Sequence, residues 1–288
     1  MGTYASIDGR IVPGEQASVS VFDNGFAFGD SVYETLRTYS GRPFAPRRHL
    51  RRLRASADRL GFAIPLADSE LRDRIDAVLA AAANPESYLR LIVSRGRGDL
   101  SYDFARVIGP TVVIVAKALE PFPEAARRDG IAAALVSVRR NHPLALDPAI
   151  KSSNLLNNVL ATREAQARGA QEALLLNAEG RLAEGAGSNV FLVKAGALLT
   201  PLLSGGLLAG ITRELVLETA RRLGVIAREA DLGEPDLRGA DEVFVTSTLK
   251  EVMPVTRLDG APVGDGRPGA VTRRLQDAYH DLTLAPDV

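Results

Sequence analysis

The stretch from Lys151 to Phe191 constrains the fold most, because its apolar residues change from a helical to an extended pattern. Its first part predicts an amphipathic helix that stops at Gly169, from apolar residues at helical spacing: Leu155, Leu156, Val159 and Leu160. A short apolar strand is expected at Ala173–Leu176, closed by a turn at Asn177–Gly180. A second strand is expected at Asn189–Val193. The chain must therefore combine helices with a sheet.

Two charged residues frame this stretch. Lys151 lies just before the predicted helix, in the turn-prone sequence DPAIKSSN, where its side chain can project into a cleft. A lysine so placed can attack a carbonyl carbon and form a Schiff base, whereas an isolated lysine before a helix is usually solvated. Glu184 follows the turn and precedes a glycine-rich bend.

Composition excludes several classes of protein. With 35 Lys and Arg against 35 Asp and Glu, the chain lacks the basic excess of a nucleic-acid-binding protein. It has no cysteine, so disulfides and thiolate sites are excluded, and its three histidines lack metal-ligand spacing, which predicts no metal site. The N-terminal sequence is not that of a signal peptide, and no apolar run is long enough to span a membrane. We expect a cytoplasmic protein.

The remaining elements predict two lobes. Further strands are expected at Val32–Tyr39, Tyr88–Ser94, Val112–Ala116, Ile131–Val138 and Glu242–Thr246, and helices at Pro46–Gly61, Ser69–Ala83, residues 210–223 and from Arg267 onward. The segment Leu119–Gly130, with two prolines, is expected to link the lobes. The predicted divisions are a small N-terminal α/β lobe (1–118), a linker (119–130) and a larger C-terminal lobe (131–288) that carries Lys151.

Two predicted strands have an unusually polar face. Val32–Tyr39 places Tyr33, Arg37 and Tyr39 opposite Val32, Glu34, Leu36 and Thr38, and Tyr88 and Arg90 lie opposite Leu89, Leu91 and Val93. An arginine among apolar neighbours is costly to bury without an anionic partner. This face is therefore either solvated or lines a cleft that holds a carboxylate.

Seven segments in this order make the chain similar to a known family: FDNGFAFGDSVYETLR, RRHLRRLRASADRLG, IKSSNLLNNVLA, EALLLNAEGRLAEGAGSNVF, LLTP, LLAGITREL and ADEVFVTSTLKEVMPV. The chain resembles the class IV, or fold type IV, pyridoxal-phosphate aminotransferases, which include branched-chain and D-amino-acid aminotransferases and aminodeoxychorismate lyases. The resemblance covers nearly the whole chain. It implies an α/β (α+β) fold of two lobes, with mixed sheets and flanking helices, and a homodimer.

The resemblance also implies a role for individual residues toward pyridoxal 5′-phosphate. Lys151 would carry the cofactor as a Schiff base and act as the catalytic base, and Glu184 would pair with the pyridine nitrogen. Arg52, in the string HLRRL, would bind the phosphate with its planar fork. Leu208 would pack on the ring, and the phosphate site would be completed by Ile211, Thr212, Ser247 and Thr248. Thr212 is also a good helix cap, which would explain it without a ligand.

The substrate residues and the reaction follow from the same resemblance. The substrate wall would contain Phe28, Tyr33, Arg37, Tyr88, Arg90 and Leu249. The Y-x-R string at Tyr88 and the string GAGSN favour a transaminase that moves an amino group between a branched-chain or aliphatic L-amino acid and 2-oxoglutarate. Phe28 departs from the branched-chain pattern, which usually has a tyrosine there. The string KSSNLL is closer to D-amino-acid aminotransferases, and the Arg95–Gly98 loop is compatible with the lyase that releases pyruvate. A non-catalytic cofactor-binding protein is the remaining alternative.

Overall fold

The computed structural model describes residues 1–285 and divides the chain into two compact units. The first unit comprises residues 1–120 and 150–154, and the second comprises residues 121–149 and 155–285. The expected lobes differ from these units at Ile150–Asn154, which the sequence analysis assigns to the C-terminal lobe. This segment belongs to the first unit because it hydrogen-bonds to that unit's sheet. The Tyr33 N–H donates to the Lys151 carbonyl oxygen, and the Ser153 N–H donates to that of Ser31, both at 2.9 Å.

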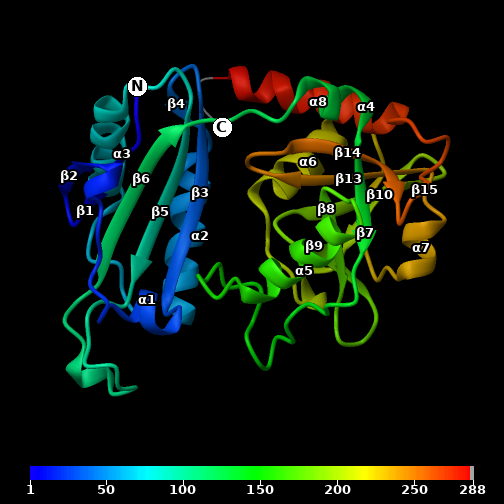
Figure 1. Cartoon of the computed structure of the whole chain (residues 1–288). Helices are drawn as coiled ribbons and strands as arrows, with labels where there is room; N and C mark the ends of the chain where they lie inside the picture. The colour runs from blue at the N-terminus through cyan, green and yellow to red at the C-terminus, as the bar shows by residue number, and fades with distance from the viewer. Residues whose placement is uncertain (286–288) are drawn as a thin grey trace. The chain divides into compact units, whose positions relative to one another are not determined.

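The first unit is a six-stranded antiparallel sheet with two long helices on one face (Figure 1). The strand order is β2-β1-β6-β5-β3-β4. The strands are β1 Tyr4–Ile7, β2 Arg10–Pro13, β3 Ser31–Tyr39, β4 Arg42–Pro43, β5 Ser87–Ser94 and β6 Thr111–Ala118. The helices are α1 Asn24–Phe28, α2 Pro46–Arg59 and α3 Asp68–Ala82, with short 3₁₀ turns at Gly14–Gln16 and Phe104–Arg106.

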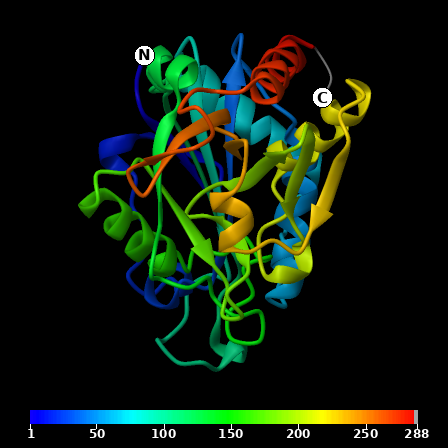
Figure 2. The same cartoon turned by 90° about the vertical axis from the view of Figure 1, so that its right-hand side faces the viewer.

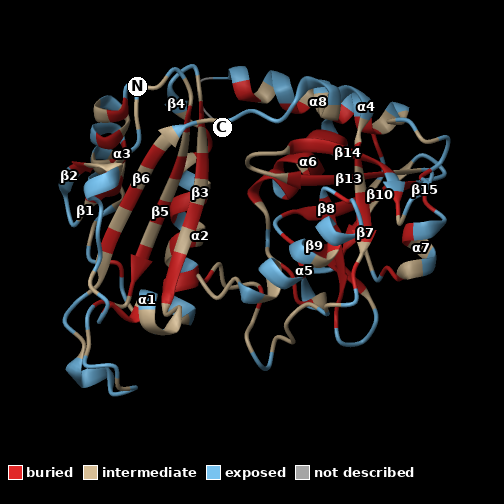
Figure 3. Ribbon diagram, in the orientation of Figure 1, coloured by how far each residue is buried: buried red, intermediate tan, exposed pale blue. Residues whose placement is uncertain are grey.

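Alternating burial fixes which face of this sheet is packed. Along β3 and β5 every second residue is buried, as the sequence predicts, and Figure 3 shows the alternation as red and tan bands. Leu36, Leu89 and Leu91 pack against Leu50 and Leu53 of α2 and against α3 in one hydrophobic core. The opposite, half-buried face carries the tyrosines and arginines singled out in the sequence.

The second unit contains a nine-stranded mixed sheet (Figure 2, where α8 is red). Its order is β12-β11-β10-β13-β14-β7-β8-β9, with β15 beside β14. The strands are β7 Ile131–Leu135, β8 Glu172–Leu176, β9 Leu182–Gly185, β10 Asn189–Lys194, β11 Ala197–Pro201, β12 Ala227–Ala230, β13 Glu242–Ser247, β14 Glu251–Leu258 and β15 Ala261–Pro262. The helices are α4 Glu124–Asp129, α5 Leu156–Ala167, α6 Ile211–Arg222, α7 Glu234–Arg238 and α8 Ala270–Leu284, with a 3₁₀ turn at Leu203–Gly205.

Helix α5 packs differently from the prediction. Its buried residues are Ala161 and Ala165, which join a cluster rich in alanine against β7 and β8. The apolar side chains expected on its inner face are instead 70% (Leu156), 57% (Val159) and 46% (Leu160) exposed. Small side chains let the helix approach the sheet closely, so the larger ones point outward. None of the helices among residues 1–285 is long and apolar enough to cross a membrane.

Candidate active site

Lys151 lies beside the half-buried face of the first unit's sheet. Its backbone N–H donates to Ser56 Oγ of α2 at 3.2 Å, while its carbonyl oxygen accepts the β3 hydrogen bond described above. The amine Nζ lies over the Tyr33 ring, 4.6 Å from the ring centroid. Helix α2 and strand β3, both far from Lys151 in the sequence, therefore hold its backbone, while its amine lies on the polar face of the sheet.

Arginines and tyrosines alternate across this same face. The Arg90 guanidinium carbon also lies over the Tyr33 ring, 4.0 Å from its centroid, and Arg90 Nη1 donates to the Tyr88 hydroxyl at 3.5 Å. Arg37 lies over the Tyr39 ring at 4.1 Å. Stacking on an aromatic ring holds a guanidinium in place while its N–H edge still faces outward.

Phe28 is positioned by the turn before β3. It ends α1, whose first turn is capped by the side chain of Asp23. Its ring packs against Tyr102 with centroids 5.1 Å apart. Asn154 Nδ2 donates to the Gly29 carbonyl oxygen at 3.0 Å, which ties this turn to the lysine segment.

Arg52 is held by a buried carboxylate that the sequence analysis did not assign a role. Glu34 is completely buried and accepts two hydrogen bonds of 2.7 Å from Arg52, while His49 Nδ1 lies 2.7 Å from Glu34 Oε2. Burial favours the neutral acid, but Arg52 and His49 outweigh it and lower the pKa of Glu34 to about 2. Burial lowers the pKa of His49 despite Glu34. An ionised Glu34 and a neutral His49 thus fix the orientation of the Arg52 guanidinium.

Glu184 is the centre of a network in the second unit. Its Oε1 accepts from Arg140 Nε at 2.7 Å, and its Oε2 accepts from the Leu208 N–H at 3.1 Å. Asn189 Nδ2 donates to the Leu208 carbonyl oxygen at 2.9 Å and lies 3.5 Å from Glu184 Oε2. The carboxylate, 5% exposed, is therefore held from several sides.

The start of α6 adjoins this network. The N-cap is Gly210 and no side chain caps the helix, so Thr212, the second helical residue, is not the cap that the sequence predicted. A Cβ atom on Gly210 would lie 1.9 Å from Asn189 Oδ1, which shows how closely the two approach. Uncapped N–H groups at a helix start favour an anion.

The hydroxyl residues at the end of β13 lie next to the same network. Asn189 pairs in register with Thr246, Ser247 is the half-buried last residue of β13, and the half-buried Thr248 and Leu249 begin the turn that follows. The buried Thr246 hydroxyl has no hydrogen-bond partner within residues 1–285. The second unit therefore gathers these predicted residues at one place: Glu184, Leu208, Ile211, Thr212, Ser247, Thr248 and Leu249.

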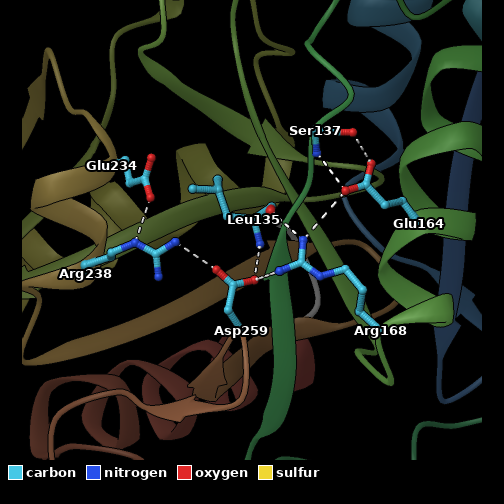
Figure 4. A network of polar contacts seen from close by, with 7 residues as sticks. All are labelled: Leu135, Ser137, Glu164, Arg168, Glu234, Arg238 and Asp259. Atoms are coloured by element: carbon cyan, nitrogen blue, oxygen red, sulfur yellow. Dashed lines mark hydrogen bonds and ion pairs between the residues drawn. The ribbon is translucent and has the colours of Figure 1, made fainter.

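A further network in the second unit supports the segment that leads to Arg140 (Figure 4). Asp259 accepts hydrogen bonds from Arg168 at 2.5 Å, Arg238 at 2.9 Å and the Leu135 N–H at 3.1 Å. Glu164 of α5 accepts from the N–H and hydroxyl of Ser137, just after β7. The path of the chain between β7 and Arg140 is thereby fixed.

The sequence analysis missed four residues in these networks: Glu34, His49, Arg140 and Asn189. Glu34 had a visible signal, since it is an acid on the face shared with Val32 and Leu36 and so needed a buried partner. His49 belongs to the same string as Arg52. Arg140 and Asn189 had no distinguishing pattern, because their role depends on contacts with residues far along the chain.

Comparisons with known proteins identify the family. The model of the family "Amino-transferase class IV" matches residues 31–258. A protein of Methanocaldococcus jannaschii, provisionally named a branched-chain-amino-acid aminotransferase, is 40% identical over 276 residues, which are 96% of this chain and 95% of that protein. A D-alanine aminotransferase of Bacillus licheniformis is 33% identical, with 96% of each chain covered.

Solved structures agree with this result. The branched-chain amino acid aminotransferase of Escherichia coli gives a TM-score of 0.90 at 33% identity, covering 97% of this chain and 94% of that one. A second branched-chain amino acid aminotransferase, solved with pyridoxamine 5′-phosphate, gives 0.93 at 33% identity, covering 99% of this chain and 96% of that one. The chain therefore belongs to the class IV aminotransferase family. It is an aminotransferase of fold type IV, and its cofactor is pyridoxal 5′-phosphate.

The groups present fit the chemistry of this cofactor. An aldehyde needs an amine, which Lys151 supplies on the polar face of its unit. A pyridine nitrogen needs a fixed carboxylate, and Glu184 is a carboxylate held in place by Arg140. A phosphate needs N–H or guanidinium donors, and such donors are present at the uncapped start of α6 in the second unit and on the oriented Arg52 in the first.

Proposed function

We propose that this aminotransferase moves an amino group between a branched-chain or aliphatic L-amino acid and 2-oxoglutarate. The observation that carries the proposal is the Tyr33 ring, against which both the Lys151 amine and the Arg90 guanidinium lie. A cation that could bind a carboxylate thus shares an aromatic neighbour with the amine that would work at the substrate Cα. Such an arrangement suits an amino acid, and Arg90 suits the second carboxylate of glutamate.

The relatives support the branched-chain assignment. The relative with the higher identity, 40%, bears a branched-chain name, and a solved branched-chain aminotransferase that shares the fold is seen with a phosphopyridoxyl-glutamate. The D-alanine aminotransferase is 33% identical, so transfer from a D-amino acid is the second candidate. Phe28 and Leu249 are our candidates for the apolar wall that an aliphatic side chain needs.

We assign the residues as follows. When bound, pyridoxal phosphate supplies an electron sink that stabilises negative charge at the substrate Cα. Lys151 would hold the cofactor between turnovers and, once released, would act as the general base that moves a proton between the substrate Cα and the cofactor C4′. Glu184 keeps a proton at the pyridine nitrogen, and Arg140 and the Leu208 N–H fix the direction of that carboxylate. The phosphate is held by Arg52, the N–H groups of Ile211 and Thr212, and the hydroxyls of Thr212, Ser247 and Thr248.

We further propose that the enzyme is a homodimer. The outward face of α5 exposes Leu156, Val159 and Leu160, which lie one turn apart along the helix. Neighbouring exposed apolar side chains on one helix are typical of a surface that a second protein covers. A second copy of this chain is the partner that the family resemblance implies.

A donor panel tests the substrate assignment. The holoenzyme is assayed with both enantiomers of leucine, valine and alanine, with 2-oxoglutarate as acceptor. We expect L-leucine and L-valine to react faster than D-alanine. Faster reaction with D-alanine would assign the enzyme to the D-amino-acid branch instead.

The role of Arg90 is tested by half-reactions. In Arg90→Ala, glutamate and 2-oxoglutarate should react much more slowly, while the reaction with L-leucine changes little, because only the diacids use the second cation. Arg37→Ala is the matched variant on the same face. Equal losses for both donors in Arg90→Ala would show that Arg90 binds the α-carboxylate or only supports the sheet.

A further inference from the structure

A single buried carboxylate joins two loops of the second unit. Glu172, the first residue of β8, is 3% exposed. Its Oε2 accepts a hydrogen bond from the Ser188 hydroxyl at 2.9 Å and forms an ion pair with Lys250, while Oε1 accepts from the Ala173 N–H at 3.2 Å. Buried ions need partners in good geometry, so this carboxylate restrains both loops from which its partners come.

Lys250 belongs to the turn between β13 and β14. Its N–H donates to Ser247 Oγ at 3.1 Å, and its side chain is only 17% exposed. The next residue, Glu251, has a left-handed backbone with φ of 54° and forms an ion pair with Arg127 of α4. The turn that carries Thr248 and Leu249 is therefore fastened to β8 on one side and to α4 on the other.

Ser188 belongs to the bend between β9 and β10. The bend separates Glu184 from Asn189, and the Gly185 N–H closes it by donating to the Ser188 carbonyl oxygen at 2.7 Å. A Cβ atom on Gly185 would lie 2.2 Å from Ser188 Oγ and 3.1 Å from Glu172 Oε1, so the bend packs tightly against Glu172. The hydrogen bond between Ser188 and Glu172 therefore helps to hold the bend that begins directly after Glu184.

We propose that Glu172 and Lys250 are positioning residues, which set the turn carrying Thr248 and Leu249 and hold it in register with the bend that follows Glu184. The pair touches neither substrate nor cofactor in this assignment. It acts through the residues that the proposed function places at the phosphate and the substrate, and so rests on that proposal.

The test replaces the lysine by an apolar side chain of similar length. In Lys250→Met we expect the dissociation constant of pyridoxal phosphate from the apo-enzyme and the KM of the amino donor each to rise at least roughly fivefold, a change of about 1 kcal/mol. Lys250→Arg, which keeps the charge, should recover most of the loss. Lys194→Met is the control, because Lys194 makes an exposed contact of 3.9 Å with Asp236 in the same unit. If Lys250→Met lowers the melting temperature but leaves cofactor binding and KM unchanged, the pair has only a structural role.

A double-mutant cycle tests whether the pair acts as one unit. Glu172→Gln and Lys250→Met should impair binding no more together than either does alone, because each removes the same contact. Additive losses would contradict the proposal. If Glu172→Gln fails to fold, Ser188→Ala removes a single hydrogen bond to the same carboxylate and should raise the dissociation constant in the same direction; an unchanged constant would overturn the coupling to the bend.

Thr248→Ala separates failure of this inference from failure of the proposed function. If Thr248→Ala weakens cofactor binding and Lys250→Met does not, the site assignment stands and the positioning role is wrong. If neither variant changes binding or KM, the assignment of this turn to the site fails, and the positioning role fails with it.

Discussion

At the scale of single residues, the site depends on charges that are oriented before anything binds. Glu34 directs Arg52, and Arg140 directs Glu184. In each pair the acid is almost completely buried and the base is only slightly exposed. A guanidinium or carboxylate held in this way loses little freedom when its ligand arrives, which favours binding.

Glu34 gives a prediction about how the free energy of unfolding depends on pH. Its pKa is lowered from 4.5 to about 2, so its contribution is present above pH 4.5 and is lost as the pH falls toward 2. Glu34→Gln should therefore destabilise the apo-protein at pH 7 by about 3 kcal/mol, because Arg52 then lacks its buried partner. The difference in free energy of unfolding between Glu34→Gln and the parent protein should become smaller below pH 4.5.

Denaturant unfolding at a series of pH values measures this difference. Glu15→Gln removes an exposed acid in the same unit and should show little change at any pH. A destabilisation by Glu34→Gln that stays constant down to pH 3 would mean that the ionised carboxylate is not what holds Arg52.

The sequence predicted which residues belong to the candidate site, but it did not predict which residues form hydrogen bonds or ion pairs with them. Strand alternation was sufficient to place Tyr33, Arg37 and Arg90 on one face, and it also placed Glu34 on the buried face. The identity of a buried partner is not local information. His49 and Arg52 approach Glu34 from a helix, across the sheet-to-helix packing. No periodicity in the strand could indicate which helical residues would meet it.

At the scale of elements, the helices and strands that were predicted began and ended close to the predicted residues, but the buried face of α5 and the N-cap of α6 were wrong. The spacing of Leu156, Val159 and Leu160 indicated a helix correctly and its buried face wrongly, because an alanine face allows closer packing on β8 than leucines would. In α6 the glycine before the helix, rather than Thr212, occupies the N-cap. A close approach to Asn189 explains why a glycine is there.

Gly210 gives a prediction at this scale. Gly210→Ala should leave the fold intact, since the backbone φ of −71° suits any residue, but the added Cβ must displace Asn189. Because Asn189 contacts Leu208 and Glu184, we expect the dissociation constant of pyridoxal phosphate to rise roughly tenfold, or about 1.4 kcal/mol.

The control is Gly187→Ala, where nothing lies within 4 Å of the added atom. Titration of the two apo-proteins with cofactor compares them directly. If both variants bind as the parent does, the contact between Gly210 and Asn189 is not a constraint on the start of α6.

At the scale of the whole molecule, each unit carries only part of the predicted site. The first unit holds Lys151, Arg52 and the polar face, and the second holds Glu184 and the start of α6. The placement of Lys151 could not be read from the sequence, because it depends on pairing between β3 and a segment more than a hundred residues later. The outward face of α5 is likewise a property of the folded chain, and it leads to the next prediction.

Charges on this face should separate the proposed dimer. A variant with Leu156→Glu and Val159→Glu places two like charges on α5, and each would be desolvated in an interface, so we expect a predominantly monomeric protein in sedimentation equilibrium. Ile226→Glu, at a residue 59% exposed elsewhere in the second unit, is the control and should keep the parent mass. A double variant with the parent mass would exclude this face from the interface.

The path of the chain through residues 150–154 also has a consequence for biosynthesis. A ribosome completes the six strands of the first sheet by Ala118, yet Lys151 is added only after the residues of β7 have been made. At typical rates of synthesis of about 5–20 residues per second, roughly 2–7 s pass between the addition of Ala118 and the addition of Lys151, whose segment binds along β3. During that interval the backbone groups of Ser31 and Tyr33 that Lys151 and Ser153 later engage have yet to receive their native partners. Docking of the lysine segment is thus a late event of synthesis, and the nascent first unit is complete only when part of the second has already emerged.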